Sequence, residues 1–181
     1  YGEVMGVDDD WTWVLERACD HCGYQADALE RDELGGRIRG VGGAWRETLG
    51  RGSAVSRLRD GDDRIWTPLQ YGCHVSDVVK LFDERTRQML KKRKPPTFTD
   101  WDQEEEAVKS DYAKQDPAKV AYDLASSAGK YADLLDRVNG DEWQNEGIRS
   151  DGERFTVESL ARYMLHEVEH HLWDARQQID G

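Results

Sequence analysis

Four stretches of this 181-residue chain place apolar residues at the three- and four-residue spacing of an amphipathic helix. They cover residues 34–49, 71–89, 120–138 and 157–175. Four helices of this length predict an all-α fold and are typical of a four-helix bundle. The alternation typical of a strand is weak along the chain, and only residues 11–15 suggest one.

Three of these helices have recognisable start signals. Thr67 precedes Pro68 and Asp116 precedes Pro117, so in both places a capping side chain is followed by proline at the first helical position. Thr156 is the capping residue expected to open the last helix.

A long connection separates the second and third helices. It spans residues 94–115 and contains Trp101. A crossover of this length allows neighbouring helices of a bundle to run in the same direction. We therefore expect a single domain over residues 1–181, with an irregular N-terminal extension (1–28) and a helical bundle (29–181).

Charge and composition restrict the expected partners. The net charge of −12 should repel nucleic acid, and the basic run at residues 91–94 is interpreted as a helix C-terminus, where cations complement the helix dipole. No apolar run approaches the roughly 20 residues needed to cross a bilayer, and the N-terminus lacks the pattern of a signal peptide. With three cysteines, the chain is expected to be cytoplasmic, with no nucleic-acid or membrane partner.

The last helix contains the densest group of potential metal ligands in the sequence. Three of the five histidines lie within the six residues HEVEHH at 166–171. His166 with His170, and Glu167 with His171, are each four residues apart and so share a helix face. Either pair can contribute to the coordination of one divalent ion such as zinc. An exposed polar face with incidental histidines explains this density less well.

Helical phase favours one of the two pairs. At about 100° per residue, Glu167 and His171 lie at the flank of the apolar stripe. His74 also lies at the flank of the stripe of its own helix, so a metal ion reached by His74 favours Glu167 and His171 as the other ligands. Asp174, three residues after His171, could orient an imidazole from outside the coordination sphere.

The other pair, His166 and His170, remains the alternative. It lies nearly opposite the centre of the apolar stripe, beside Tyr163 and Trp173. This face is more apolar than a solvent face should be. The N-terminal 30 residues or a second subunit, in a homodimer, could cover it.

The sequence HEVEH also matches the H-E-x-x-H pattern of zinc proteases, with Glu167 as general base. That pattern needs a third ligand, usually downstream. Only 10 residues follow His171, and they contain no histidine, glutamate or cysteine. A zinc hydrolase of this type is therefore a remote alternative.

Two segments resemble the DinB-like superfamily, which includes the N-terminal domain of mycothiol-dependent maleylpyruvate isomerase and related thiol S-transferases. The first is WTPLQYGCHVSDV at residues 66–78, and the second is YMLHEVEHHLWD at residues 163–174. The resemblance covers about residues 30–180. It implies a four-helix bundle in which three side chains hold one ion and leave open positions for water or substrate.

Position by position, the resemblance implies that His74, Glu167 and His171 are metal ligands and that Asp174 is their outer partner. Other members use two histidines four residues apart, a pattern that His166 and His170 would match. The implied chemistry is activation of a thiol, because a divalent ion lowers the pKa of a thiol bound to it. The thiolate then attacks an electrophile or adds reversibly to a double bond.

The resemblance thus predicts a metal-dependent thiol S-transferase or isomerase. Its expected ion is zinc, with nickel as an alternative, and its expected co-substrate is a low-molecular-weight thiol such as mycothiol. A second hypothesis is a non-catalytic, metal-stabilised module that binds a small molecule or acts in a stress response. Arg149 and Arg154, which flank an Asp-Gly turn before the last helix, could contact an anionic substrate.

Cys19 and Cys22 form a C-x-x-C pair outside the matched region. Such a pair is half of a zinc site, but His21 and Cys73 do not complete it convincingly. A structural zinc site, a redox pair and ordinary packing cysteines all remain open. Cys73 is interpreted as a core residue.

Overall fold

The structure is a computed structural model that describes residues 10–59, 65–91 and 93–180. The α-helices are Leu34–Leu49 (α1), Pro68–Lys91 (α2), Gln103–Lys109 (α3), Pro117–Leu135 (α4) and Val157–Asp180 (α5). Two strands, Glu146–Ile148 (β1) and Arg154–Thr156 (β2), form an antiparallel hairpin. Short 3-10 helices lie at Thr12–Leu15, Ala26–Ala28, Arg31–Glu33, Gly52–Ser56, Tyr112–Lys114 and Gly140–Gln144.

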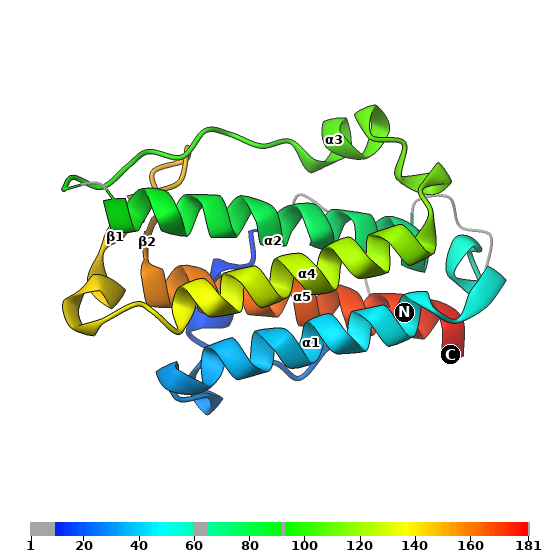
Figure 1. Cartoon of the computed structure of the whole chain (residues 1–181), viewed down its shortest axis with the longest axis horizontal. Helices are drawn as coiled ribbons and strands as arrows, with labels where there is room; N and C mark the ends of the chain where they lie inside the picture. The colour runs from blue at the N-terminus through cyan, green and yellow to red at the C-terminus, as the bar shows by residue number, and fades with distance from the viewer. Residues whose placement is uncertain (1–9, 60–64, 92, 181) are drawn as a thin grey trace.

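Helices α1, α2, α4 and α5 form a four-helix bundle (Figure 1). Both α1 and α2 pack mainly against α4 and α5. Figure 1 shows that α1 and α5 run in one direction and that α2 and α4 run in the other. The neighbours α2 and α4 are therefore parallel, which requires a long crossover between them. The predicted all-α bundle with a crossover connection is confirmed.

The crossover passes along the outer side of α2 and contains α3 (Figure 1). Near its start, the amide of Phe98 donates a hydrogen bond of 2.8 Å to the carbonyl of Ile148 in β1. Farther along, the indole of Trp101 stacks on the imidazole of His74, with ring centroids 5.8 Å apart. The connection is thus tied both to the hairpin and to the middle of the bundle.

The helices begin where their capping residues predict. At the start of α2, Thr67 Oγ1 accepts from the amide of Gln70, and Gln70 Oε1 accepts from the amide of Thr67. Thr156 and Ser159 make the same reciprocal pair at the start of α5. Each pair satisfies two of the amides that a helix N-terminus leaves without intrahelical partners.

One expectation about local structure is wrong. Residues 11–15 do not form a strand, because Thr12–Leu15 is a 3-10 helix. Trp11 and Val14 are both buried, and their spacing of three residues is the period of a 3-10 turn. The hairpin of β1 and β2 was not predicted, since strands of three residues are too short to show alternation.

Most of the segment of residues 10–33 packs against α5, behind the bundle in the view of Figure 1, whereas its last 3-10 helix, Arg31–Glu33, packs against α1. Its side chains Trp11, Cys19 and Tyr24 are buried. The hydroxyl of Tyr24 donates a hydrogen bond of 2.7 Å to the carbonyl of Arg162 in α5. The face of α5 that carries His166 and His170 is therefore covered by the N-terminal segment of the same chain.

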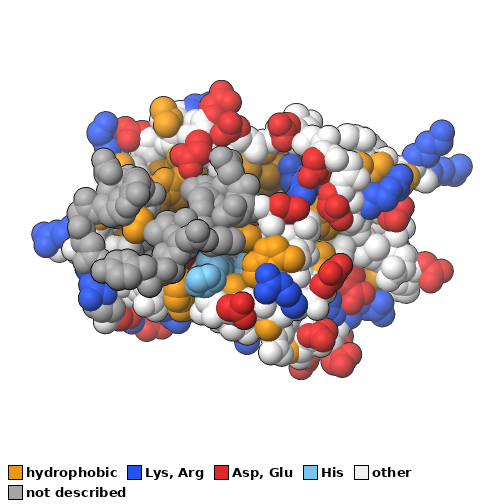
Figure 2. Space-filling view, turned by 180° about the vertical axis from the view of Figure 1, so that it is seen from behind, with side chains coloured by type: hydrophobic (Ala, Val, Ile, Leu, Met, Phe, Trp, Pro, Cys, Tyr) orange, Lys and Arg blue, Asp and Glu red, His pale blue; other side chains and the backbone are white. Residues whose placement is uncertain are grey.

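The described surface carries charges of both signs. On the face shown in Figure 2, acidic and basic side chains are interspersed among hydrophobic ones. Among the described residues, no helix is both long and apolar enough to cross a membrane.

Candidate metal centre

The structure brings together His74 from α2 with Glu167 and His171 from α5. One ligand atom of each lies within 4.8 Å of the others. Glu167 Oε2 is 3.5 Å from His171 Nε2 and 4.0 Å from His74 Nε2. We call these three residues the histidine–glutamate cluster.

His74 is the most enclosed member of this cluster. Its side chain is 1% exposed, and within the part of the chain that the structure describes neither ring nitrogen has a hydrogen-bond partner. Burial lowers the pKa of His74 below its ordinary value, so the ring is neutral and offers a lone pair. Buried polar atoms are nearly always partnered, and an unpartnered neutral imidazole is therefore suited to hold a metal ion.

Glu167 and His171 shift each other's pKa in opposite directions. Burial raises the pKa of Glu167, but its contacts with His171 and His74 outweigh that effect, so the carboxyl pKa is well below its usual range. Burial lowers the pKa of His171, whereas Asp174 and Glu167 raise it more strongly, to about 9. The carboxylate of Glu167 is therefore ionised and ready to act as a ligand.

Asp174 fixes the orientation of His171. Its Oδ2 lies 3.0 Å from His171 Nδ1, while Nε2 of the same ring faces Glu167. With Asp174 holding the proton at Nδ1, a divalent ion would bind at Nε2 in place of the second proton of this ring.

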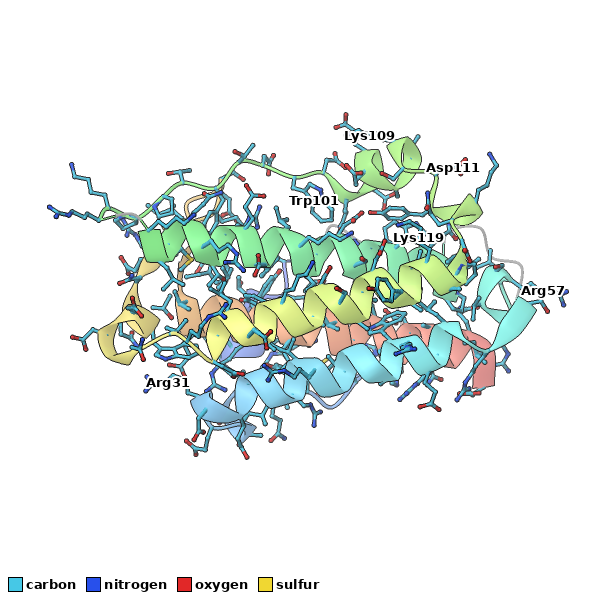
Figure 3. All side chains as sticks on the ribbon, viewed as in Figure 1. Arg31, Arg57, Trp101, Lys109, Asp111 and Lys119 are labelled. Carbon is cyan, nitrogen blue, oxygen red and sulfur yellow. The ribbon has the colours of Figure 1, made fainter. Side chains whose placement is uncertain are left out.

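Aromatic rings surround the histidine–glutamate cluster. His74 lies between Trp66 and Trp101, whose ring centroids are 5.3 Å and 5.8 Å away. Figure 3 shows Trp101 between the crossover and α2. The ring of Tyr71 stacks on His171 at 5.1 Å. This setting excludes water from much of the site and strengthens the electrostatic interactions within it.

A second cluster lies on the neighbouring face of α5, where the N-terminal segment covers the helix. It contains Cys19, Cys22, His166 and His170, and one ligand atom of each lies within 4.8 Å of the other three. The Sγ of Cys19 is 3.5 Å from His170 Nδ1. We call these four residues the cysteine–histidine cluster.

The members of the cysteine–histidine cluster are largely removed from solvent. Cys19, His166 and His170 are buried. Both nitrogens of His166 lack hydrogen-bond partners in residues 10–59, 65–91 and 93–180, and burial lowers its pKa to about 4. Burial also raises the pKa of Cys22 to about 12.

The two pairs on α5 therefore face different partners. Glu167 and His171 turn toward His74 on α2, whereas His166 and His170 turn toward the cysteines of the N-terminal segment. From the sequence, the two pairs are alternatives for one ion. His166 and His170 are not connected with the cysteines in the sequence analysis. The available signal was the complementary spacing, C-x-x-C in one segment and H-x-x-x-H in another.

The other candidate residues from the sequence belong to neither cluster. Arg149 forms ion pairs with Asp10 and Asp151, and Arg154 pairs with Glu146. Neither pairing includes a member of the two clusters. Cys73 is buried, as expected for a core residue.

Comparisons with known proteins agree with this architecture. The family model of the DinB superfamily matches residues 8–175. No curated protein matches the sequence. Among solved structures, YfiT from Bacillus subtilis, described as "a probable metal-dependent hydrolase with an unusual four-helix bundle topology", superposes with a TM-score of 0.70 at 19% identity, covering 81% of this chain and 86% of that one. Since the family model spans nearly the whole sequence, the chain belongs to the DinB superfamily.

Proposed function

We propose that the chain is a metal-dependent enzyme whose histidine–glutamate cluster holds one divalent ion, zinc or nickel, and activates a low-molecular-weight thiol such as mycothiol. The observation that carries the proposal is the donor set of two imidazoles and one carboxylate, from His74, His171 and Glu167. Catalytic zinc sites commonly have three such protein ligands and keep the fourth position for water or substrate.

The geometry of the cluster supports this assignment. Two nitrogen or oxygen ligands of one tetrahedral zinc ion lie about 3.4 Å apart, given bond lengths of about 2.0–2.2 Å. The separation of 3.5 Å between Glu167 and His171 is close to this value. The separation of 4.0 Å between His74 Nε2 and Glu167 Oε2 is about half an ångström longer than this value.

A bound divalent ion would lower the pKa of a coordinated thiol or water and so supply a nucleophile at neutral pH. The protein's own residues provide the setting. Asp174 holds the tautomer of His171, and Trp66 and Trp101 shield His74 from solvent. The side chain of Glu167 is 15% exposed, which leaves the cluster approachable from its side.

Trp11 adds a donor next to the cluster. Its ring centroid is 5.3 Å from that of His171, and its buried indole Nε1 has no hydrogen-bond partner among the described residues. A buried N–H of this kind could bind an electronegative atom of a substrate.

Hydrolysis is the second candidate function. The description of YfiT as a probable metal-dependent hydrolase favours it, because the same donor set could activate water in place of a thiol. The H-E-x-x-H form of hydrolase has less support, since His166 and His170 face the cysteines.

The test compares two reactions on zinc- or nickel-loaded protein. A chromogenic electrophile is offered with a low-molecular-weight thiol, and a chromogenic ester is offered without thiol. We expect thiol-dependent turnover that falls to the background rate in His74→Ala, because the ion loses one of its three protein ligands. Tyr122→Ala, which changes an exposed side chain of α4 outside both clusters, should retain full activity.

The two reactions separate the candidate functions. Turnover of the ester alone would replace the transferase by a hydrolase. Failure of both reactions with several thiols, on protein shown to contain the ion, would contradict the proposal in favour of a non-catalytic binding module.

A further inference from the structure

The cysteine–histidine cluster combines the four donors of a closed zinc site. Two thiols and two imidazoles are the ligand set of a structural Cys2His2 site, and the C-x-x-C spacing of Cys19 and Cys22 is the usual one. His166 and His170 are separated by three residues, which also lies within the range of such sites. Their four ligand atoms lie within 4.8 Å of one another.

Distances within the cluster agree with a shared ion. In a tetrahedral zinc site, a sulfur and a nitrogen ligand lie about 3.6 Å apart, from bond lengths of about 2.3 Å and 2.0–2.1 Å. The separation between Cys19 Sγ and His170 Nδ1 is 3.5 Å. A thiol and an imidazole buried together therefore already have the spacing that a common zinc ion would impose.

His166 provides an independent observation. Its side chain is 0% exposed, and no described residue forms a hydrogen bond with either of its nitrogens. A disulfide between Cys19 and Cys22 would satisfy the two sulfurs but would leave this imidazole without a partner. A metal ion would satisfy all four side chains at once, and so it accounts for more of the cluster than a redox pair does.

The backbone presents both cysteines on one turn. The amide of Gly23 donates to the carbonyl of Cys19, and the amide of Cys19 donates to the carbonyl of Tyr24, both at 2.9 Å. Gly23 has φ of +75°, a conformation that favours glycine. The turn thus directs both thiols toward α5.

We propose that the cysteine–histidine cluster is a structural zinc site, in which Cys19, Cys22, His166 and His170 hold one zinc ion tetrahedrally and fasten the N-terminal segment to α5. This ion is distinct from the one in the histidine–glutamate cluster. Its four protein ligands leave no position for substrate, so its role is to hold the fold together.

The proposed ion would also help to position Trp11 next to the histidine–glutamate cluster. Trp11 belongs to the fastened segment, and its ring centroid lies 4.5 Å from that of His170 and 5.3 Å from that of His171. Holding the segment against α5 therefore holds Trp11 against the histidine–glutamate cluster.

Metal content tests the proposal directly. Protein purified under reducing conditions without chelator is analysed for zinc per chain by mass spectrometry. The double variant C19S/C22S should contain one fewer ion than the wild type. The matched control is Cys73→Ser, which removes a buried thiol outside the cluster and should leave the zinc content unchanged.

Cobalt substitution tests for thiolate ligands in the wild type itself. Cobalt-loaded wild type should show thiolate-to-cobalt charge-transfer absorption in the near ultraviolet, together with the strong visible bands of a tetrahedral site. His74→Ala should keep this absorption, because only the other cluster is changed. Failure of the proposed function is thereby distinguished from failure of the zinc site.

Two results would overturn the proposal. One is a cobalt-loaded wild type that lacks thiolate charge-transfer absorption. The other is a disulfide between Cys19 and Cys22 in protein alkylated directly on cell lysis. Both measurements use the wild type, so they remain decisive if C19S/C22S does not fold.

Discussion

Asp174 presents its carboxylate to histidines of both clusters. Its Oδ2 is 3.0 Å from His171 Nδ1, and its Oδ1 is 3.8 Å from His170 Nε2. In each ring, the nitrogen that faces Asp174 is the one turned away from the other members of the cluster. One side chain therefore makes a hydrogen-bond contact with a candidate ligand in one cluster and a longer contact with a candidate ligand in the other.

Asp174→Asn is expected to weaken metal binding mainly at the histidine–glutamate cluster, where Asp174 lies within hydrogen-bond distance of His171. Outer partners of metal-bound histidines typically contribute about 10–100-fold to affinity, and an amide orients the imidazole less strongly than a carboxylate does. Titration with a competing chelator would measure the loss at each site. Asp180→Asn is the control, because this residue of the same helix pairs with Arg51. Equal affinities in D174N and wild type would contradict the role assigned to Asp174.

At the scale of the elements, close packing of α1 and α4 depends on one glycine. A Cβ built on Gly42 would lie 2.9 Å from the Cβ of Ala128, closer than such atoms approach. Gly43, the next residue of α1, is exposed and would have nothing within 4 Å of its Cβ. Both glycines lie in α1, but Gly42 faces α4 whereas Gly43 faces solvent.

Alanine at these two positions should change stability in opposite directions. Both substitutions remove the helix-interior penalty of glycine, about 1 kcal/mol, so Gly43→Ala should stabilise the protein by about that amount. Gly42→Ala forces α1 and α4 apart, and overpacking of this kind costs about 1–3 kcal/mol. Thermal unfolding would measure both, with about 2–4 °C expected per kcal/mol. A higher melting temperature for G42A than for G43A would refute this packing argument.

At the scale of the whole molecule, the N-terminal segment is joined to the bundle by side chains far apart in sequence. Trp11, Cys19 and Tyr24 are part of the same hydrophobic core as the helices. The segment of residues 10–33 contains only short 3-10 helices, which contribute little stability of their own. Its order therefore depends on its contacts with α5 and on the proposed zinc ion.

Chelation should release this segment before the bundle unfolds. Removing the ion leaves four side chains buried without their common partner, so amide exchange in residues 11–29 should accelerate while α1, α2, α4 and α5 stay protected. Hydrogen exchange followed by mass spectrometry would show this, and added zinc should restore protection. In His74→Ala, the segment should remain protected until chelator is added. Unchanged exchange in fully zinc-depleted protein would contradict the expectation.

Much of the bundle could be predicted from the chain itself. The apolar spacing and the capping residues Thr67 and Thr156 located the helix starts, because helix formation depends on neighbours three and four residues apart. The length of the crossover indicated that parallel neighbours were allowed. The hairpin of β1 and β2 was missed. Its strands are too short to show an alternating pattern, and their pairing depends on contacts that form only in the folded chain.

For the candidate site, local sequence determined which side chains of α5 share a face. The spacing of four residues grouped Glu167 with His171 and His166 with His170, because both pairings follow from helical geometry alone. Helical phase also favoured the first pair as the partners of His74, and the structure brings these three residues together. Only the tertiary structure decided that the second pair meets Cys19 and its neighbour Cys22. Those contacts depend on how α2 and the N-terminal segment pack around α5, and such long-range packing is set by the fold of the whole chain.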